Sequence, residues 1–178
     1  MKKLKLKIII AGEPGAGKSF LAKTTDVCYP TREIGVSIGK ISETIKGTSF
    51  EMTLLTWTVT SGRPKESTHL KYADAAIIVC DLTRPDTVDV SWEWANRILK
   101  ITGDIPIYFA ANNVNQRTKD TLNRLKNIAN KFNSPCFPIK SRDRKSARKI
   151  FRAIAQGLFA RFEQRMSWPE GQEKGIGG

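Results

Sequence analysis

The strongest constraint on this chain is a glycine-rich segment, Gly12–Ser19, that follows the apolar run Ile8-Ile9-Ile10. It reads Gly-Glu-Pro-Gly-Ala-Gly-Lys-Ser, which matches the G-x-x-x-x-G-K-S pattern of loops that wrap a phosphate group. Glycines allow conformations that point successive N–H groups inward, and the helix that follows adds its positive end. The segment therefore predicts a strand, a phosphate-binding loop and a helix in direct succession.

Individual positions of this loop have expected roles. Lys18 would reach the β- and γ-phosphate oxygens of a nucleotide, and the Ser19 hydroxyl would ligate Mg²⁺. Pro14 is unusual in such a loop because it has no N–H to offer a phosphate. The residues expected to contact the phosphates are Glu13, Pro14, Gly15, Ala16, Gly17, Lys18, Ser19 and Phe20.

Apolar periodicity divides the rest of the chain into alternating strands and helices. Strands are expected over residues 4–11, 34–46, 48–60, 75–80, 105–110 and 136–139, and helices over 18–26, 86–102, 117–132 and 143–165. This alternation predicts an α/β fold, with a six-stranded, mostly parallel sheet, one antiparallel hairpin and helices on both faces. We expect one domain over residues 1–165 and a flexible tail over 166–178.

The charge balance bears on the partners. The net charge is +13, and nine basic residues against two acidic ones lie between Lys140 and Arg165. No nucleic-acid-binding motif accompanies them, so we expect no nucleic-acid partner. The basic segment is either an ordinary solvated helix face or a peripheral, electrostatic contact with a membrane or an acidic partner. Three scattered cysteines favour reduced thiols and a cytoplasmic location.

Two further segments resemble a known family. The stretch IGVSIGKISETIKGTSFEMTLLTW and the stretch YADAAIIVCDLTRPDT resemble strands of the Ras superfamily of small GTPases, most closely its Rab-like branch. The resemblance covers about residues 5–165. It implies the small G-protein type of P-loop NTPase fold and a signalling switch that binds GTP or GDP with Mg²⁺. It also implies regulatory or effector proteins as partners, and we expect a monomer.

The metal-binding and catalytic positions depart from the family's pattern. Where the family has a threonine before IGV, this chain has Glu33, and Thr31 is the candidate substitute as an Mg²⁺ ligand. A shortened loop with no metal role is the other interpretation. In the family's W-D-x-x-G-Q motif, Thr58 replaces the aspartate and Arg63 stands in place of the glutamine. Arg63 is the candidate catalytic residue, but it cannot accept a proton from water, so hydrolysis is expected to be slow or absent.

The base-recognition motifs depart as well. The family's N-K-x-D motif appears as Asn112-Asn113-Val114-Asn115, and its S-A-K motif as Ser141-Arg142-Asp143. Asn115 offers one acceptor and one donor where an aspartate would accept two hydrogen bonds from guanine. The unmet donor costs on the order of 1–3 kcal/mol, which predicts relaxed purine recognition. Candidate base-contacting residues are Asn112, Asn113, Asn115, Ser141 and Arg142.

Two other functions are compatible with the same loop. In a P-loop phosphotransferase or ATPase, Asp81 at the end of the run AAIIVCD would hold Mg²⁺ in place of the missing aspartate. In a pseudo-GTPase interaction module, the fold would survive with its nucleotide permanently bound or absent. Nucleotide exchange distinguishes a switch from such a module, and ATP-dependent phosphorylation of a small acceptor would identify a phosphotransferase.

Overall fold

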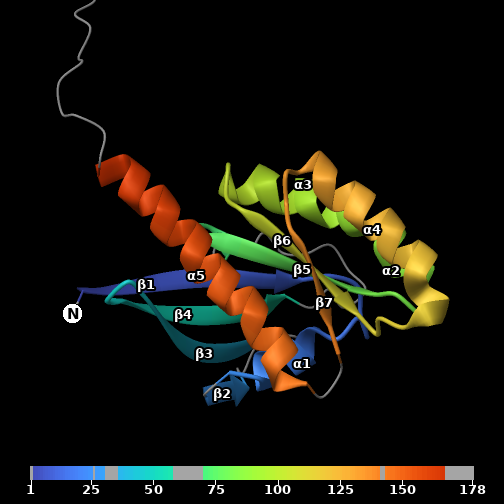
Figure 1. Ribbon diagram of the computed structural model, residues 1–178, viewed down its shortest axis with the longest axis horizontal. Coiled ribbons are helices and arrows are strands. Elements are labelled where there is room, and N and C mark those ends of the chain that lie inside the picture. The colour runs from blue at the N-terminus through green and yellow to red at the C-terminus, as the bar shows by residue number, and fades with distance from the viewer. Residues whose placement is uncertain (1, 26, 31–35, 58–69, 141–142, 167–178) are drawn as a thin grey trace, which may run out of the picture.

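The computed structural model describes residues 2–25, 27–30, 36–57, 70–140 and 143–166. They form an α/β structure around a seven-stranded sheet with the order β2-β3-β4-β1-β5-β6-β7 (Figure 1). The strands are β1 (Lys2–Ala11), β2 (Val27–Pro30), β3 (Val36–Ile45), β4 (Thr48–Trp57), β5 (Ala75–Asp81), β6 (Ile107–Asn112) and β7 (Cys136–Ile139). All neighbours from β4 to β7 are parallel, whereas β3 pairs antiparallel with both β2 and β4.

Helices cover both faces of this sheet, as the sequence predicts. They are α1 (Lys18–Lys23), α2 (Pro85–Asp89), α3 (Ser91–Thr102), α4 (Lys119–Lys131) and α5 (Arg144–Met166), with a 3₁₀ turn η2 (Gln116–Thr118) before α4. One core cluster joins the sheet to α1 and α5, and a second joins it to α2, α3 and α4. In Figure 1, α5 crosses the sheet on the side nearest the viewer.

The apolar run of β1 contributes to both core clusters. Ile8 and Ile10 pack on the side of α1 and α5, and Ile9 packs on the opposite side with α3 and α4. This division follows from the alternation of side chains along a strand. The central strands β5 and β6 are buried at every position, which explains their unbroken apolar sequences.

The six expected strands are all present, and the sheet has one strand more than predicted. The additional strand, β2, is a four-residue edge strand whose Tyr29 lies opposite Ile38 of β3. It is defined as a strand by its pairing with β3, which the sequence of this segment alone does not reveal. The predicted strand over 105–110 begins only at Ile107, because Pro106 has no N–H to donate to a neighbouring strand.

The prediction of a single helix over 86–102 is wrong, because two helices, α2 and α3, occupy this region. The break falls at Val90, between α2 and α3. Beside it, the Ser91 hydroxyl donates to the carbonyl of Val88 at 2.7 Å. Hydroxyls near a helix end compete in this way with the backbone for its carbonyls.

The topology creates a natural binding edge at the carboxyl ends of the parallel strands. After β1 the chain passes to β3 and β4 on one side of β1, and it then returns to β5 on the other side. Open α/β sheets bind ligands at such a switch point, outside the carboxyl ends of the strands. The loops that follow β1, β5 and β6 meet there.

Candidate phosphate-binding site

The glycines of the loop after β1 are required by its geometry. Gly12, Gly15 and Gly17 have φ angles of 136°, 78° and 110°, in a region that residues with a Cβ rarely adopt. A Cβ at Gly12 would lie 2.3 Å from the carbonyl oxygen of Val79 on β5, and one at Gly17 would lie 2.4 Å from Asn112 Nδ2. The loop backbone therefore packs directly against the ends of β5 and β6.

The loop presents a set of backbone donors. The N–H of Ala16 donates to the carbonyl of Glu13 at 3.2 Å, which closes the turn at its tip. Within the described part of the chain, the N–H groups of Gly15, Gly17, Lys18 and Ser19 have no acceptor. Successive N–H donors without acceptors, in a turn built from positive-φ glycines, form the kind of nest that binds anions.

Lys18 lies across this loop. Its side chain is buried, and Nζ donates to the carbonyls of Gly12 and Glu13, each at 2.7 Å. Burial lowers the pKa of Lys18 to about 8, against a smaller opposite effect of the Glu13 charge. An ammonium has three N–H donors, so one remains for a ligand oxygen while the other two fix its position.

The next residues of the loop divide between exposed and structural positions. Ser19, the candidate Mg²⁺ ligand, is exposed at the start of α1. Ala16 is fully buried, and Phe20 packs against the core cluster under α1 and α5. Ala16 and Phe20 therefore shape the loop from beneath, whereas Ser19 faces outward.

Two contacts that the sequence analysis did not anticipate hold the tip of the loop. Arg84, in the connection after β5, donates through Nη1 to the carbonyl of Pro14 at 2.8 Å. Trp94 on α3 donates through Nε1 to the Glu13 carboxylate, also at 2.8 Å. The position of Arg84 just after β5 places it at the binding edge, but nothing in the sequence pairs either residue with the loop.

Asn112, the last residue of β6, contacts the glycine-rich loop, whereas Asn115, three residues later, contacts its own segment. Asn112 is buried, and its Nδ2 donates to the carbonyl of Ala16 at 3.1 Å, which brings the first asparagine of the predicted base-recognition motif to the phosphate loop. Asn115 instead caps η2: its Oδ1 accepts from the N–H of Arg117 at 2.8 Å, and its Nδ2 donates to the carbonyl of Asn113 at 3.2 Å. Its amide is thus engaged in its own loop.

Asp81, the Mg²⁺ ligand of the alternative ATPase interpretation, is also engaged. Its Oδ1 accepts from the Thr83 N–H at 3.0 Å, the Thr83 hydroxyl at 2.7 Å and Asn113 Nδ2 at 2.9 Å. Burial alone would raise the pKa of the Asp81 carboxyl. The hydrogen bonds from Asn113 and Thr83, together with the charge of Arg84, outweigh burial and lower it. This oxygen is therefore occupied by protein donors.

Several predicted site residues cannot be placed relative to the loop. Thr31, Glu33, Thr58, Arg63, Ser141 and Arg142 lie outside the described residues. Among the residues that are described, no group of three or more histidine, cysteine or carboxylate side chains is arranged to hold a metal ion. The metal and catalytic assignments therefore stay predictions.

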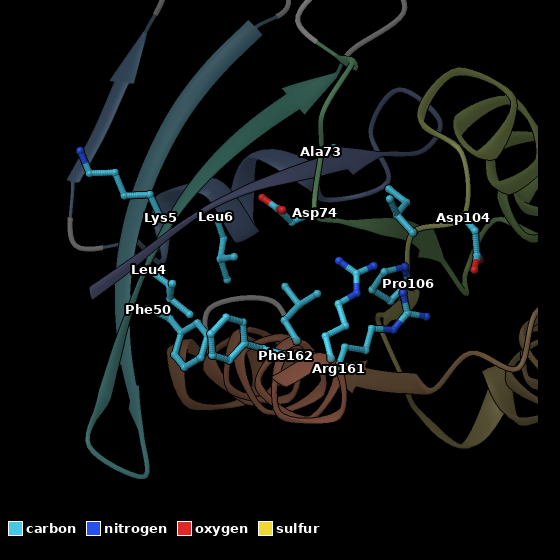
Figure 2. Close-up of a pocket in the computed structure, with 13 residues that line it drawn as sticks. Leu4, Lys5, Leu6, Phe50, Ala73, Asp74, Asp104, Pro106, Arg161 and Phe162 are labelled. Carbon is cyan, nitrogen blue, oxygen red and sulfur yellow. The ribbon is translucent and has the colours of Figure 1, made fainter. Parts of the chain in front are cut away.

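A separate pocket of about 360 Å³ lies at the opposite edge of the sheet, where the parallel strands begin. Figure 2 shows apolar side chains of β1 and β4 facing those of α5 across it. It is lined by Leu4, Lys5, Leu6, Phe50, Ala73, Asp74, Asp104, Ile105, Pro106, Leu158, Arg161, Phe162 and Arg165. Leu4 and Leu6 begin β1, whereas the glycine-rich loop follows its end, so the two sites are distinct.

No helix in the described ranges is both long enough and apolar enough to cross a membrane. Neither a scan against protein-family models nor a search of the curated proteins finds a match for this chain.

Proposed function

We propose that this chain is a nucleotide-binding protein of the small G-protein type, with weak or absent intrinsic hydrolysis. The observation that carries the proposal is the loop after β1, in which Lys18 bridges the carbonyls of Gly12 and Glu13 over a turn whose amides have no acceptor among the described residues. Such a loop suits a pyrophosphate group, since amide donors and one cation converge on the same space.

The arrangement of the sheet supports the P-loop NTPase fold as the finer description. The loop lies at a topological switch point, and the β3–β4 hairpin leads back to the parallel part of the sheet beside β1. Asn112, from the first position of the base-recognition motif, reaches the loop through Ala16. The phosphate loop and the proposed base-recognition segment therefore lie side by side at the carboxyl ends of the parallel strands.

The nucleotide is a purine, GTP or GDP, held with relaxed base selectivity and with Mg²⁺ ligated by Ser19. Relaxed selectivity is supported by Asn115, whose amide already donates to and accepts from its own loop. A guanine could bind it in the usual way only by displacing these hydrogen bonds, each of which contributes about 1 kcal/mol. With Arg63 in place of glutamine, intrinsic hydrolysis would be slow, and the protein would act by binding regulatory or effector proteins.

Isothermal titration with GDP, GTP, XTP and ATP in the presence of Mg²⁺ tests the proposal. The wild-type protein should bind at least one of them at submillimolar concentration, and Lys18→Met should weaken that binding at least tenfold. Lys23→Met is the matched control, because Lys23 is exposed at the end of the same helix. Absence of binding by the wild type would refute the proposal, and a bound nucleotide that never exchanges would identify an inert interaction module.

We further propose that the first turns of α5 make a peripheral, electrostatic contact with anionic membranes. The cationic face comprises the exposed residues Arg144, Lys145, Arg148, Lys149 and Arg152. No acidic residue lies in the first turn of α5, so these cations gather at the positive end of the helix dipole. Arg148 also pairs with Glu43 of β3 at 3.5 Å, so part of its charge contributes to the fold. Lys145 and Lys149 are like charges four residues apart, which destabilises a helix by a few tenths of a kcal/mol and favours a role in binding.

A further inference from the structure

The tip of the phosphate loop, at Glu13 and Pro14, presents less positive charge to a phosphate than the rest of the loop does. Pro14 contributes no N–H donor, and Glu13 places a carboxylate beside the anion-binding turn. Both features weaken the affinity of the turn for phosphate relative to a loop with an ordinary amide and a neutral side chain at these positions. A compensating positive group near Pro14 and Glu13 is therefore expected on physical grounds.

Arg84 is the group that the structure places there. Its Nη1 lies 2.8 Å from the carbonyl oxygen of Pro14 and 3.1 Å from the point that a Cβ on Gly15 would occupy. The guanidinium therefore covers the outer edge of the Pro14–Gly15 peptide. A Cβ at position 15 would require the guanidinium to shift by a few tenths of an ångström, and the φ of 78° is the stronger reason for a glycine there.

The guanidinium is itself held in place from the other side. The Arg84 N–H donates to the carbonyl of Asp81 at 2.9 Å, and Nη2 donates to the Asp86 carboxylate at 3.1 Å. The Thr87 N–H and hydroxyl both donate to the Arg84 carbonyl, at 3.0 and 2.8 Å. A side chain anchored at its backbone and at its tip loses little further conformational entropy when it meets a ligand.

We propose that Arg84 is a second cation of the phosphate site, which positions the loop tip through Pro14 and favours ligands with two or more phosphates. The proposal rests on the nucleotide-binding function proposed above. A guanidinium has five N–H donors, of which the described contacts use two, and the Arg84 side chain is 43% exposed. Donors therefore remain for a phosphate oxygen at the loop tip.

Two substitutions separate the charge of Arg84 from its bracing of the loop. Arg84→Gln keeps a donor but removes the charge, whereas Arg84→Lys keeps the charge but removes the rigid fork. Charge-assisted hydrogen bonds contribute enough that Arg84→Gln should weaken binding of GDP and of inorganic pyrophosphate about 10- to 100-fold. Binding of GMP should change by less than threefold, because it lacks the second phosphate.

The salt dependence of binding is the readout that a purely structural role would leave unchanged. Because salt screens the attraction between charges, loss of one cation that meets phosphate should reduce the slope of log Kd against log salt for pyrophosphate in Arg84→Gln and leave it unchanged in Arg84→Lys. Lys100→Gln is the matched control, because it removes an equal charge from the exposed last turn of α3 and should retain the wild-type slope. Thermal unfolding of each variant verifies that it folds.

The outcomes are distinct. Equal losses for GMP, GDP and pyrophosphate with an unchanged salt slope would show Arg84 to be a structural brace and overturn the proposal, as would wild-type affinity in Arg84→Gln. Failure of the wild-type protein to bind any of these ligands would instead overturn the nucleotide-binding function on which the proposal rests.

Discussion

The indole of Trp94 on α3 donates a hydrogen bond of 2.8 Å to the carboxylate of Glu13 in the glycine-rich loop after β1, 81 positions earlier in the chain. Trp94 is 6% exposed, and the guanidinium of Arg97 lies over its ring at 5.4 Å from the centroid. Any movement of the loop on ligand binding must therefore change the environment of a largely buried indole on α3.

Tryptophan fluorescence should report this coupling. Addition of GDP to the wild-type protein should shift the emission, and Trp94→Phe should abolish most of the shift while costing about 1 kcal/mol of stability for the lost hydrogen bond. Trp92→Phe is the control, since Trp92 is a half-exposed neighbour on the same helix. An unaltered shift in Trp94→Phe would contradict the coupling.

Gly12→Ala should lower the free energy of unfolding more than the same substitution at a positive-φ glycine with open space around its Cβ position. The added Cβ would meet the backbone oxygen of Val79, which cannot move without breaking β5. Gly103→Ala is the matched control, because Gly103 also has a positive φ of 81° but no atom within 4 Å of its Cβ position. We expect Gly12→Ala to cost about 1–3 kcal/mol more than Gly103→Ala in urea unfolding. Equal costs would mean that backbone strain alone explains the glycine.

Asp81→Asn should change the acid dependence of stability. The folded-state pKa of Asp81 lies below its ordinary value of 3.8, so its stabilising contribution is present above that value and is lost as the pH falls through the folded-state pKa. At pH 5 the free energy of unfolding of the wild type should exceed that of Asp81→Asn by about 1–2 kcal/mol. This difference should shrink as the pH is lowered below 3.8 in urea titrations. A constant difference would show that the carboxylate charge is not what the Thr83 and Asn113 donors stabilise.

The membrane contact is tested by charge reversal on α5. Replacing Lys145, Lys149 and Arg152 by glutamate should weaken binding to phosphatidylserine-containing vesicles roughly 100-fold, since each cation near an anionic surface contributes about 1 kcal/mol. The same reversal at Lys119, Lys126 and Lys131, which are exposed on α4 over the opposite face, should have a much smaller effect. Sedimentation with vesicles at several salt concentrations measures both, and binding that does not weaken with salt would contradict an electrostatic contact.

Local sequence determined the elements that are long and periodic. The run Ile8-Ile9-Ile10, the buried strands β5 and β6 and the amphipathic pattern of α4 and α5 were predicted, because burial on one or both faces imposes a recognisable spacing. The glycines of the phosphate loop were predicted for a related reason, since positive φ angles restrict which residues a turn accepts.

Tertiary structure alone decided which distant side chains meet that loop. Arg84 reaches Pro14 across 70 positions, and Trp94 reaches Glu13 because α3 packs against β5, the strand beside β1. Asn115 shows the same limit, because nothing in the sequence around it indicates that its amide caps η2. Periodicity records how each segment is buried, but a hydrogen bond between two segments depends on how both pack, and no spacing within either segment encodes that distance.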